Sequence, residues 1–458
     1  MNFTALRLRA LLDAYLPSRA AGLVVALSGG GDSAALLAAC AQLGERALRA
    51  VHVDHGLQPA AADLRSAAAA LAARCALPFT VLEVRIGTGA TIGATAGATA
   101  GAATGAGESL EAAARAARYA ALGADLAANE CLLTAHTLED QAETLLLQAL
   151  RGAGLKGLAA MPACRALGLG WHVRPLLGVG RHALLEFGAA AGAPGMLDPM
   201  NLDPRFDRNH LRRRIWPSVM ERWPGAGTAL ARTAAHAAAA QSLLEAIAAE
   251  DLAVLADGEA LSVTRLRRLP AARQVNALRS WIGARTHAPL PSARLAEGLR
   301  QLLEAAPDHQ PAILWKAWGL RRYRDRIMLG AAVPPRLHGE HRWRIGADAV
   351  LELGANLGRL RLVALRGGWR PERLPDELHV QPRQGGEMLQ PAQHAATQSV
   401  QHLCQFLGIL PWMRDALPFV YAGEKLIGVA DHWRDAAWCA APDAAGLGCV
   451  WEDAPEHM

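Results

Sequence analysis

The first 150 residues alternate short apolar runs with segments of helical periodicity, and this alternation limits the possible folds more than any other feature. The apolar runs lie at residues 22–27, 48–54, 79–86 and 131–135. The helical patterns lie between and after them, at residues 33–43, 61–76, 108–122 and 139–150. Such alternation indicates a parallel sheet covered by helices, and these sheets bind ligands at the carboxyl ends of their strands. We therefore expect an α/β domain with its site at that edge.

A glycine-rich loop joins the first apolar run to the first helical segment. It reads Ser28-Gly29-Gly30-Gly31-Asp32-Ser33. Glycines let backbone N–H groups approach a phosphate closely, and the helix N-terminus adds partial positive charge. The hydroxyls of Ser28 and Ser33 can donate to phosphate oxygens, and Asp32 can hold a magnesium ion that bridges the phosphates. The loop lacks the Gly-Lys-Ser/Thr of a Walker loop and the G-x-G-x-x-G of a dinucleotide loop.

The rest of the chain divides into regions that differ in composition and periodicity. A length of 458 residues exceeds what one hydrophobic core usually supports. Past residue 216 the pattern becomes helical and arginine-rich, and past residue 335 strand-like runs at 350–365 and 419–429 surround a helix near 400–406. We expect a parallel-sheet nucleotide-binding domain over residues 1–216, a helical basic domain over 217–335 and a small α/β domain over 336–458. The Gly/Ala/Thr tract at 87–107 is typical of a solvated insertion.

Composition excludes several classes of protein. No run of about 18 large apolar residues predicts a transmembrane helix, and charged residues interrupt the N-terminal helical pattern, unlike a signal peptide. We therefore expect a cytoplasmic protein without a membrane partner. The seven cysteines form no C-x-x-C pair, which argues against a zinc or iron–sulfur site. Nearly all basic residues are arginines, as a GC-rich genome favours, and clustered arginines suit phosphate groups of a nucleic acid.

The S-G-G-x-D-S loop after a strand resembles the signature of the PP-loop ATP pyrophosphatase family, and further segments resemble its tRNA(Ile)-lysidine synthetases. These segments are VHVDHGLQ (51–58), EAAARAARY (111–119), LTAHTLEDQAETLLLQALR (133–151), RGAGLKGLAAM (151–161), RPLL (174–177) and DPMNLDPRFDRNHLRRR (198–214). Two C-terminal segments, QPRQGGE (381–387) and the stretch at 405–430, continue the resemblance. Gln58, Glu139 and Met200 depart from the family's usual arginine, aspartate and serine.

The resemblance implies a nucleotide site built around the loop. ATP and Mg²⁺ would bind residues 28–33, with Asp32 as both metal ligand and catalytic residue. His55 and His136 end strands and would line the nucleotide pocket, although histidines also occupy such positions for structural reasons alone. Arg115 lies one turn from Arg118 on one helical face and would meet phosphate or an amino-acid carboxylate as a catalytic residue.

The resemblance also implies substrate-binding residues. Asp140 and Glu143 are one helical turn apart, and they would bind the ammonium of lysine, with Asp140 as a candidate base. A magnesium ion or simple helix capping are the alternatives for these acids. Arg208 and Arg212 occupy the family's R-N-x-x-R positions and would meet tRNA phosphate.

The implied reaction is the ATP-dependent attachment of free L-lysine to the 2-position of the wobble cytidine of tRNA(Ile) with a CAU anticodon. It proceeds through an adenylated base and releases pyrophosphate and AMP. The main alternative is a PP-loop tRNA 2-thiolation enzyme, whose cluster-dependent members need a C-x-x-C that this chain lacks. A catalytically inactive RNA-binding relative and a small-molecule amidating synthetase are the others. The sequence leaves a homodimer open.

Overall fold

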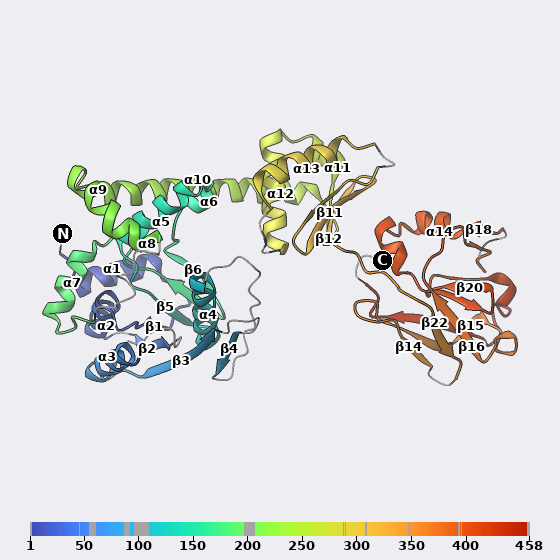
Figure 1. The fold of residues 1–458 in the computed structure, drawn as a ribbon, viewed down its shortest axis with the longest axis horizontal. Helices are drawn as coiled ribbons and strands as arrows, with labels where there is room; N and C mark the ends of the chain where they lie inside the picture. Colours follow the sequence, from blue (N-terminus) through green and yellow to red (C-terminus); the bar gives the residue numbers. More distant parts are fainter. Residues whose placement is uncertain are drawn as a thin grey trace. The chain divides into compact units, whose positions relative to one another are not determined.

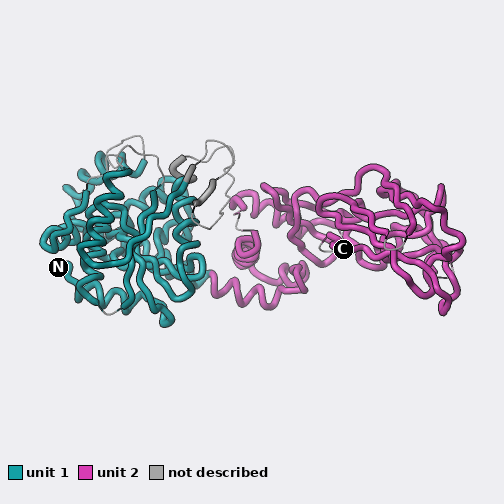
Figure 2. The backbone as a smooth tube through the Cα atoms, turned by 90° about the horizontal axis from the view of Figure 1, so that it is seen from below, with its two compact units in different colours: residues 1–244 teal, residues 245–458 magenta. Residues whose placement is uncertain are grey.

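The computed structural model describes the chain except for residues 1, 45, 55–60, 87–91, 96–109, 197–206, 287, 289, 307–308, 347–348, 393, 395 and 456–458. The described chain forms two compact units, residues 1–244 and residues 245–458 (Figure 2). The second unit contains two separate hydrophobic cores. The division into three domains at residues 216 and 335 stays a prediction.

A seven-stranded sheet forms the centre of the first unit (Figure 1). Its strands are β1 (Gly22–Ala26), β2 (Ala47–Asp54), β3 (Phe79–Ile86), β4 (Ile92–Thr95), β5 (Glu130–Leu133), β6 (Cys164–Leu167) and β7 (Gly170–Val173). They lie in the order β4-β3-β2-β1-β5-β7-β6. The inner strands pair in parallel, and the edge strands β4 and β6 pair antiparallel. The sequence therefore predicted the four main parallel strands, while β4, β6 and β7 were missed.

Helices cover both faces of this sheet, as the strand–helix alternation predicted. They are α1 (Ala5–Tyr15), α2 (Gly31–Leu43), α3 (Ala61–Arg74), α4 (Leu110–Asp125), α5 (Leu138–Leu150), α6 (Leu155–Leu158), α7 (Arg181–Ala190), α8 (Asp207–His210), the π-helical turn Leu211–Ile215 and α9 (Trp216–Arg222). Alternate residues of one strand face opposite sides of a sheet. Accordingly Leu23 and Val25 of β1 pack with α1, α2, α3 and α7, whereas Val24 packs with α4 on the other face.

The strand order reverses at β1, and this reversal positions the site. The chain leaves β1 toward β2 and β3 on one side, and later places β5 on the other side of β1. Val25 of β1 lies opposite Leu133 of β5, so the segments that follow both strands start at the same edge. These segments are the glycine-rich loop and residues 134–137. Ligands of open parallel sheets bind where the order reverses in this way.

The first core of the second unit combines helices with an antiparallel sheet that the sequence analysis did not predict. The helices are α10 (Ala226–Leu255), which begins in the first unit, α11 (Val263–Arg267), α12 (Ala271–Thr286) and α13 (Ser292–Glu304). The strands are β8 (Ala256–Asp257), β9 (Ala260–Ser262), β10 (Ala312–Trp315), β11 (Trp318–Tyr323) and β12 (Arg326–Ala331), in the order β10-β11-β12-β9-β8. Trp281 of α12, Leu295 of α13 and Leu320 of β11 meet in this core.

The second core lies in the C-terminal part and is rich in short strands. They are β13 (His341–Arg344), β14 (Val350–Glu352), β15 (Arg359–Trp369), β16 (Glu377–Gln381), β17 (Met388–Leu389), β18 (Gln398–Ser399), β19 (Phe419–Ala422), β20 (Lys425–Val429), β21 (Trp433–Arg434) and β22 (Leu447–Glu452). The helices are α14 (Val400–Leu407) and the 3₁₀ turns Pro371–Arg373, Pro411–Ala416 and Ala436–Trp438. The predicted strand-like run at 419–429 is the hairpin β19–β20, and α14 matches the predicted helix.

Within the described ranges, no helix combines the length and the apolar character needed to span a bilayer.

Candidate active site

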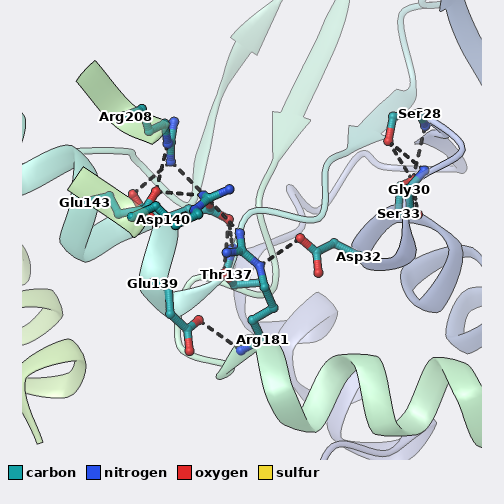
Figure 3. Close-up of polar contacts among 11 residues, drawn as sticks. Ser28, Gly30, Asp32, Ser33, Thr137, Glu139, Asp140, Glu143, Arg181 and Arg208 are labelled. Atoms are coloured by element: carbon teal, nitrogen blue, oxygen red, sulfur yellow. Dashed lines mark hydrogen bonds and ion pairs between the residues drawn. The ribbon is translucent and has the colours of Figure 1, made fainter. Parts of the chain in front are cut away.

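The glycine-rich loop is held in a tight turn by its own two serines. The Ser33 hydroxyl lies 3.0 Å from the Ser28 hydroxyl, accepts from the Ser28 N–H at 3.2 Å and donates to the Gly30 carbonyl at 3.0 Å. The Gly30 N–H donates to the Ser28 hydroxyl at 3.3 Å (Figure 3). The two hydroxyls therefore shape the loop before any ligand binds, at the N-terminus of α2, where an anion is favoured.

Close packing explains two of the three glycines. Gly29 has a φ of +87°, and a Cβ built there would lie 2.6 Å from the Leu64 carbonyl oxygen of α3. A Cβ on Gly31 would lie 2.7 Å from a Leu185 methyl carbon of α7. Gly30 meets no atom closer than 3.4 Å, so packing within the described chain does not require a glycine there. Its lack of a side chain instead leaves the backbone open to a ligand.

Arg181, the first residue of α7, joins the loop to helix α5. Its Nε donates to Asp32 Oδ2 at 3.0 Å, and its Nη2 donates to Asp140 Oδ1 at 2.9 Å. Figure 3 shows Arg181 reaching both carboxylates from the start of its helix. Glu139 accepts from the backbone N–H of Arg181 at 2.9 Å and so caps α7. Arg181 was not identified from the sequence, because only the close approach of α7 to α2 brings it to the loop.

Asp140 and Glu143 are both buried, and they form ion pairs with arginines from α8 and the following π-helical turn. Glu143 is 0% exposed and accepts from Arg208 Nε at 2.9 Å and from Arg212 Nε at 2.7 Å. Asp140 Oδ1 accepts from the Nη2 atoms of Arg208 and Arg212 at 3.1 and 2.9 Å. Asp140 Oδ2 accepts from the Thr137 N–H at 2.8 Å, which caps α5. In the structure, the two acids predicted to bind lysine therefore pair with the two arginines predicted to bind tRNA phosphate.

The cluster balances its charges and perturbs two carboxyl groups in opposite directions. Asp32, Asp140 and Glu143 provide three carboxylates, and Arg181, Arg208 and Arg212 provide three guanidinium groups. Burial raises the pKa of Asp32, and Arg181 only partly opposes this. Burial would also raise the pKa of Asp140, but Arg181 and Arg208 outweigh it and hold that pKa below its usual range.

His136 lies beside this cluster, and Arg115 lies beside the histidines. His136 Nδ1 is 2.8 Å from the Thr134 hydroxyl, and burial lowers the pKa of His136 to about 3. The Arg115 guanidinium lies 5.2 Å from the centre of the Tyr119 ring, which is 5.3 Å from the ring of His172. Among the described residues, Arg115 forms no hydrogen bond with the carboxylates; it adds positive charge near His136 instead. His55 lies outside the described residues.

Three family models match separate parts of the chain. The family model of the PP-loop domain matches residues 4–219, that of the TilS substrate binding domain matches 261–328, and that of the TilS substrate C-terminal domain matches 378–451. The tRNA(Ile)-lysidine synthase of Alkalilimnicola ehrlichii is 41% identical over 92% of each chain. That of Pseudomonas aeruginosa is 38% identical over 93% of this chain and 95% of its own, and that of Coxiella burnetii is 36% identical over 89% and 88%.

Proposed function

The chain belongs to the tRNA(Ile)-lysidine synthase family, and from this we propose that it attaches free L-lysine to the 2-position of the wobble cytidine of tRNA(Ile) with a CAU anticodon. The observation that carries the proposal is the position of the glycine-rich loop, beside a buried cluster of carboxylates and arginines at the carboxyl edge of the sheet. The family match to lysidine synthases makes the thiolation alternative the less supported one.

In the first half-reaction we place ATP on residues 28–33. The loop N–H groups and the α2 N-terminus stabilise charge on the phosphates while the cytidine 2-carbonyl oxygen attacks the α-phosphate and pyrophosphate leaves. Asp32 has the donor chemistry for Mg²⁺, which commonly takes one or two carboxylates together with substrate phosphates. Its carboxylate is 30% exposed at the start of α2, so a bound nucleotide and ion can reach it. When bound, the ion would supply charge neutralisation at the phosphates.

In the second half-reaction the lysine ε-amine attacks the activated C2 carbon and AMP departs. The amine arrives as an ammonium, yet Arg181, Arg208 and Arg212 already occupy Asp140 and Glu143. We propose that tRNA phosphate draws Arg208 and Arg212 away from these acids. One phosphate and one ammonium added together keep the cluster neutral, whereas an ammonium alone does not.

This exchange of partners also makes Asp140 a better base. Its pKa is low because arginines outweigh the effect of burial. With Arg208 drawn to phosphate, one of the charges that lower this pKa is removed and the pKa rises, so Asp140 is better able to accept the proton that the ammonium must lose. Lysine would therefore react only after tRNA is bound.

The test measures both products of the two half-reactions. We expect pyrophosphate release with ATP, Mg²⁺ and a CAU-anticodon tRNA(Ile) transcript, and AMP release only when lysine is added. A transcript with uridine at the wobble position is the matched control and should support neither. AMP release without tRNA, or incorporation of sulfur in place of lysine, would contradict the proposal. The sequence leaves a homodimer open, and the cytoplasmic location stays a prediction from the sequence.

A further inference from the structure

Buried polar side chains form a second hydrogen-bonded group beside the loop, and most of them have no role in the proposed mechanism. The group runs through Arg174, His172, Thr134 and His136. The first three are buried, with exposures of 3%, 0% and 9%. Thr134 and His136 follow β5, while His172 and Arg174 lie at the end of β7, the neighbouring strand. No carboxylate forms a hydrogen bond with either histidine in the described part of the chain, although the charge of Asp140 acts on His136. The positions of the ring protons therefore follow from the contacts within this group.

The direction of each hydrogen bond follows from the arginine. A guanidinium has only donors, so His172 Nδ1 must accept from Arg174 Nη2, 3.1 Å away. Burial and the Arg174 charge lower the pKa of His172, so the ring is neutral and carries its one proton on Nε2. That proton is donated to the Thr134 hydroxyl at 2.8 Å.

The direction of the hydrogen bond between Thr134 and His136 follows in the same way. The Thr134 oxygen accepts from His172, and its own proton points to His136 Nδ1 at 2.8 Å. If His136 Nδ1 carried a proton instead, the threonine would accept twice and its buried hydroxyl proton would have no acceptor among the described residues. A buried donor left unsatisfied has lost its hydrogen bonds to water without replacement, so this arrangement is disfavoured. His136 Nδ1 therefore accepts, and the single proton of the neutral ring lies on Nε2.

We propose that Arg174, His172 and Thr134 are positioning residues that hold His136 as the neutral Nε2–H tautomer, so that it offers a hydrogen-bond donor and not a base to the bound nucleotide. His136 lies at the sheet edge where the loop of residues 28–33 begins. An N–H there suits a phosphate oxygen of ATP or of the adenylated base. The identity of this acceptor rests on the proposed function, whereas the tautomer does not.

The tautomer is measured by ¹⁵N NMR on the full chain labelled in its histidines, with His136 assigned from the spectrum of His136→Gln. We expect Nδ1 of His136 to be the unprotonated nitrogen, and to stay so from pH 8 to about pH 5. Thr134→Val keeps the shape of the side chain but removes the hydroxyl, and we expect a mixture of the two neutral tautomers. Thr134→Ser should restore the wild-type state. A protonated Nδ1 in the wild type would overturn the proposal without requiring any variant to fold.

The kinetic test uses pyrophosphate release with saturating tRNA. Thr134→Val should lower kcat by about tenfold with little change in the KM for ATP, since a misdirected donor removes about 1.4 kcal/mol of transition-state stabilisation. Thr134→Ser should recover the wild-type kcat. An unchanged kcat in Thr134→Val overturns the proposal. If the tautomer is as expected but no AMP forms with tRNA and lysine, the proposed function fails, while the assignment of the His136 tautomer stands.

Discussion

Replacing Glu143 by glutamine should destabilise the first unit strongly, because this carboxylate is fully buried between two arginines. Removing one partner of a buried ion pair costs about 3–5 kcal/mol. The glutamine amide has nearly the same volume and keeps one oxygen acceptor. We therefore expect the free energy of unfolding to fall by about 3 kcal/mol, the lower end of this range. For a unit of 244 residues this corresponds to a fall in Tm of about 6–12 °C.

The assay is differential scanning calorimetry of the full chain, with the transition of the first unit identified by its upward shift when ATP is added. Asp207→Asn is the matched control in the same unit. Asp207 pairs with Arg151 at 3.2 Å, but the two side chains are 73% and 62% exposed. A surface pair of this kind contributes at most about 1 kcal/mol. Equal Tm shifts for the two variants would refute the reasoning that the buried cluster stabilises the fold.

Four further outcomes are expected. Asp32→Ala should fold, as circular dichroism would show, but form AMP about 10²–10³ times more slowly, because it removes charge stabilisation at the phosphates. Asp140→Asn should slow the lysine-dependent release of AMP and raise the KM for lysine while pyrophosphate release is largely kept; loss of pyrophosphate release at every lysine concentration would instead assign this acid to the metal. Gly29→Ala should lower the Tm, since its Cβ collides with the backbone of α3, whereas Gly30→Ala should not. The free energy of unfolding should fall by about 2 kcal/mol per buried histidine between pH 6.5 and 5. The unfolded chain protonates histidine near pH 6.5, whereas folded His136 does so near pH 3, so acid favours unfolding; His136→Gln should flatten this dependence in urea titrations.

The periodicity of apolar residues was sufficient to predict the main strands and helices, because each of them buries one apolar face. The predicted run at 79–86 is β3 over the same residues, and the loop at residues 28–33 lies between β1 and α2 as expected. The edge strands β4 and β6 were missed because they are short and pair antiparallel at the edges of the sheet. The sheet β8–β12 was missed because β8 and β9 are only two and three residues long. Its remaining strands, β10–β12, follow directly on a region of helical periodicity.

The sequence by itself determined the strand–loop–helix motif, the acids that open α5 and the residue types that meet phosphate, since these depend on neighbours along the chain. Only the tertiary structure decided which charges pair. Arg181 is about 150 residues from Asp32 in the chain, and no local pattern predicts their contact. Arg208 and Arg212 were predicted to face phosphate, yet in the structure they occupy Asp140 and Glu143, because a buried carboxylate is stable only with a partner. The direction of the hydrogen bonds to His136 likewise arises from β5 and β7 lying side by side, which places a buried arginine at one end.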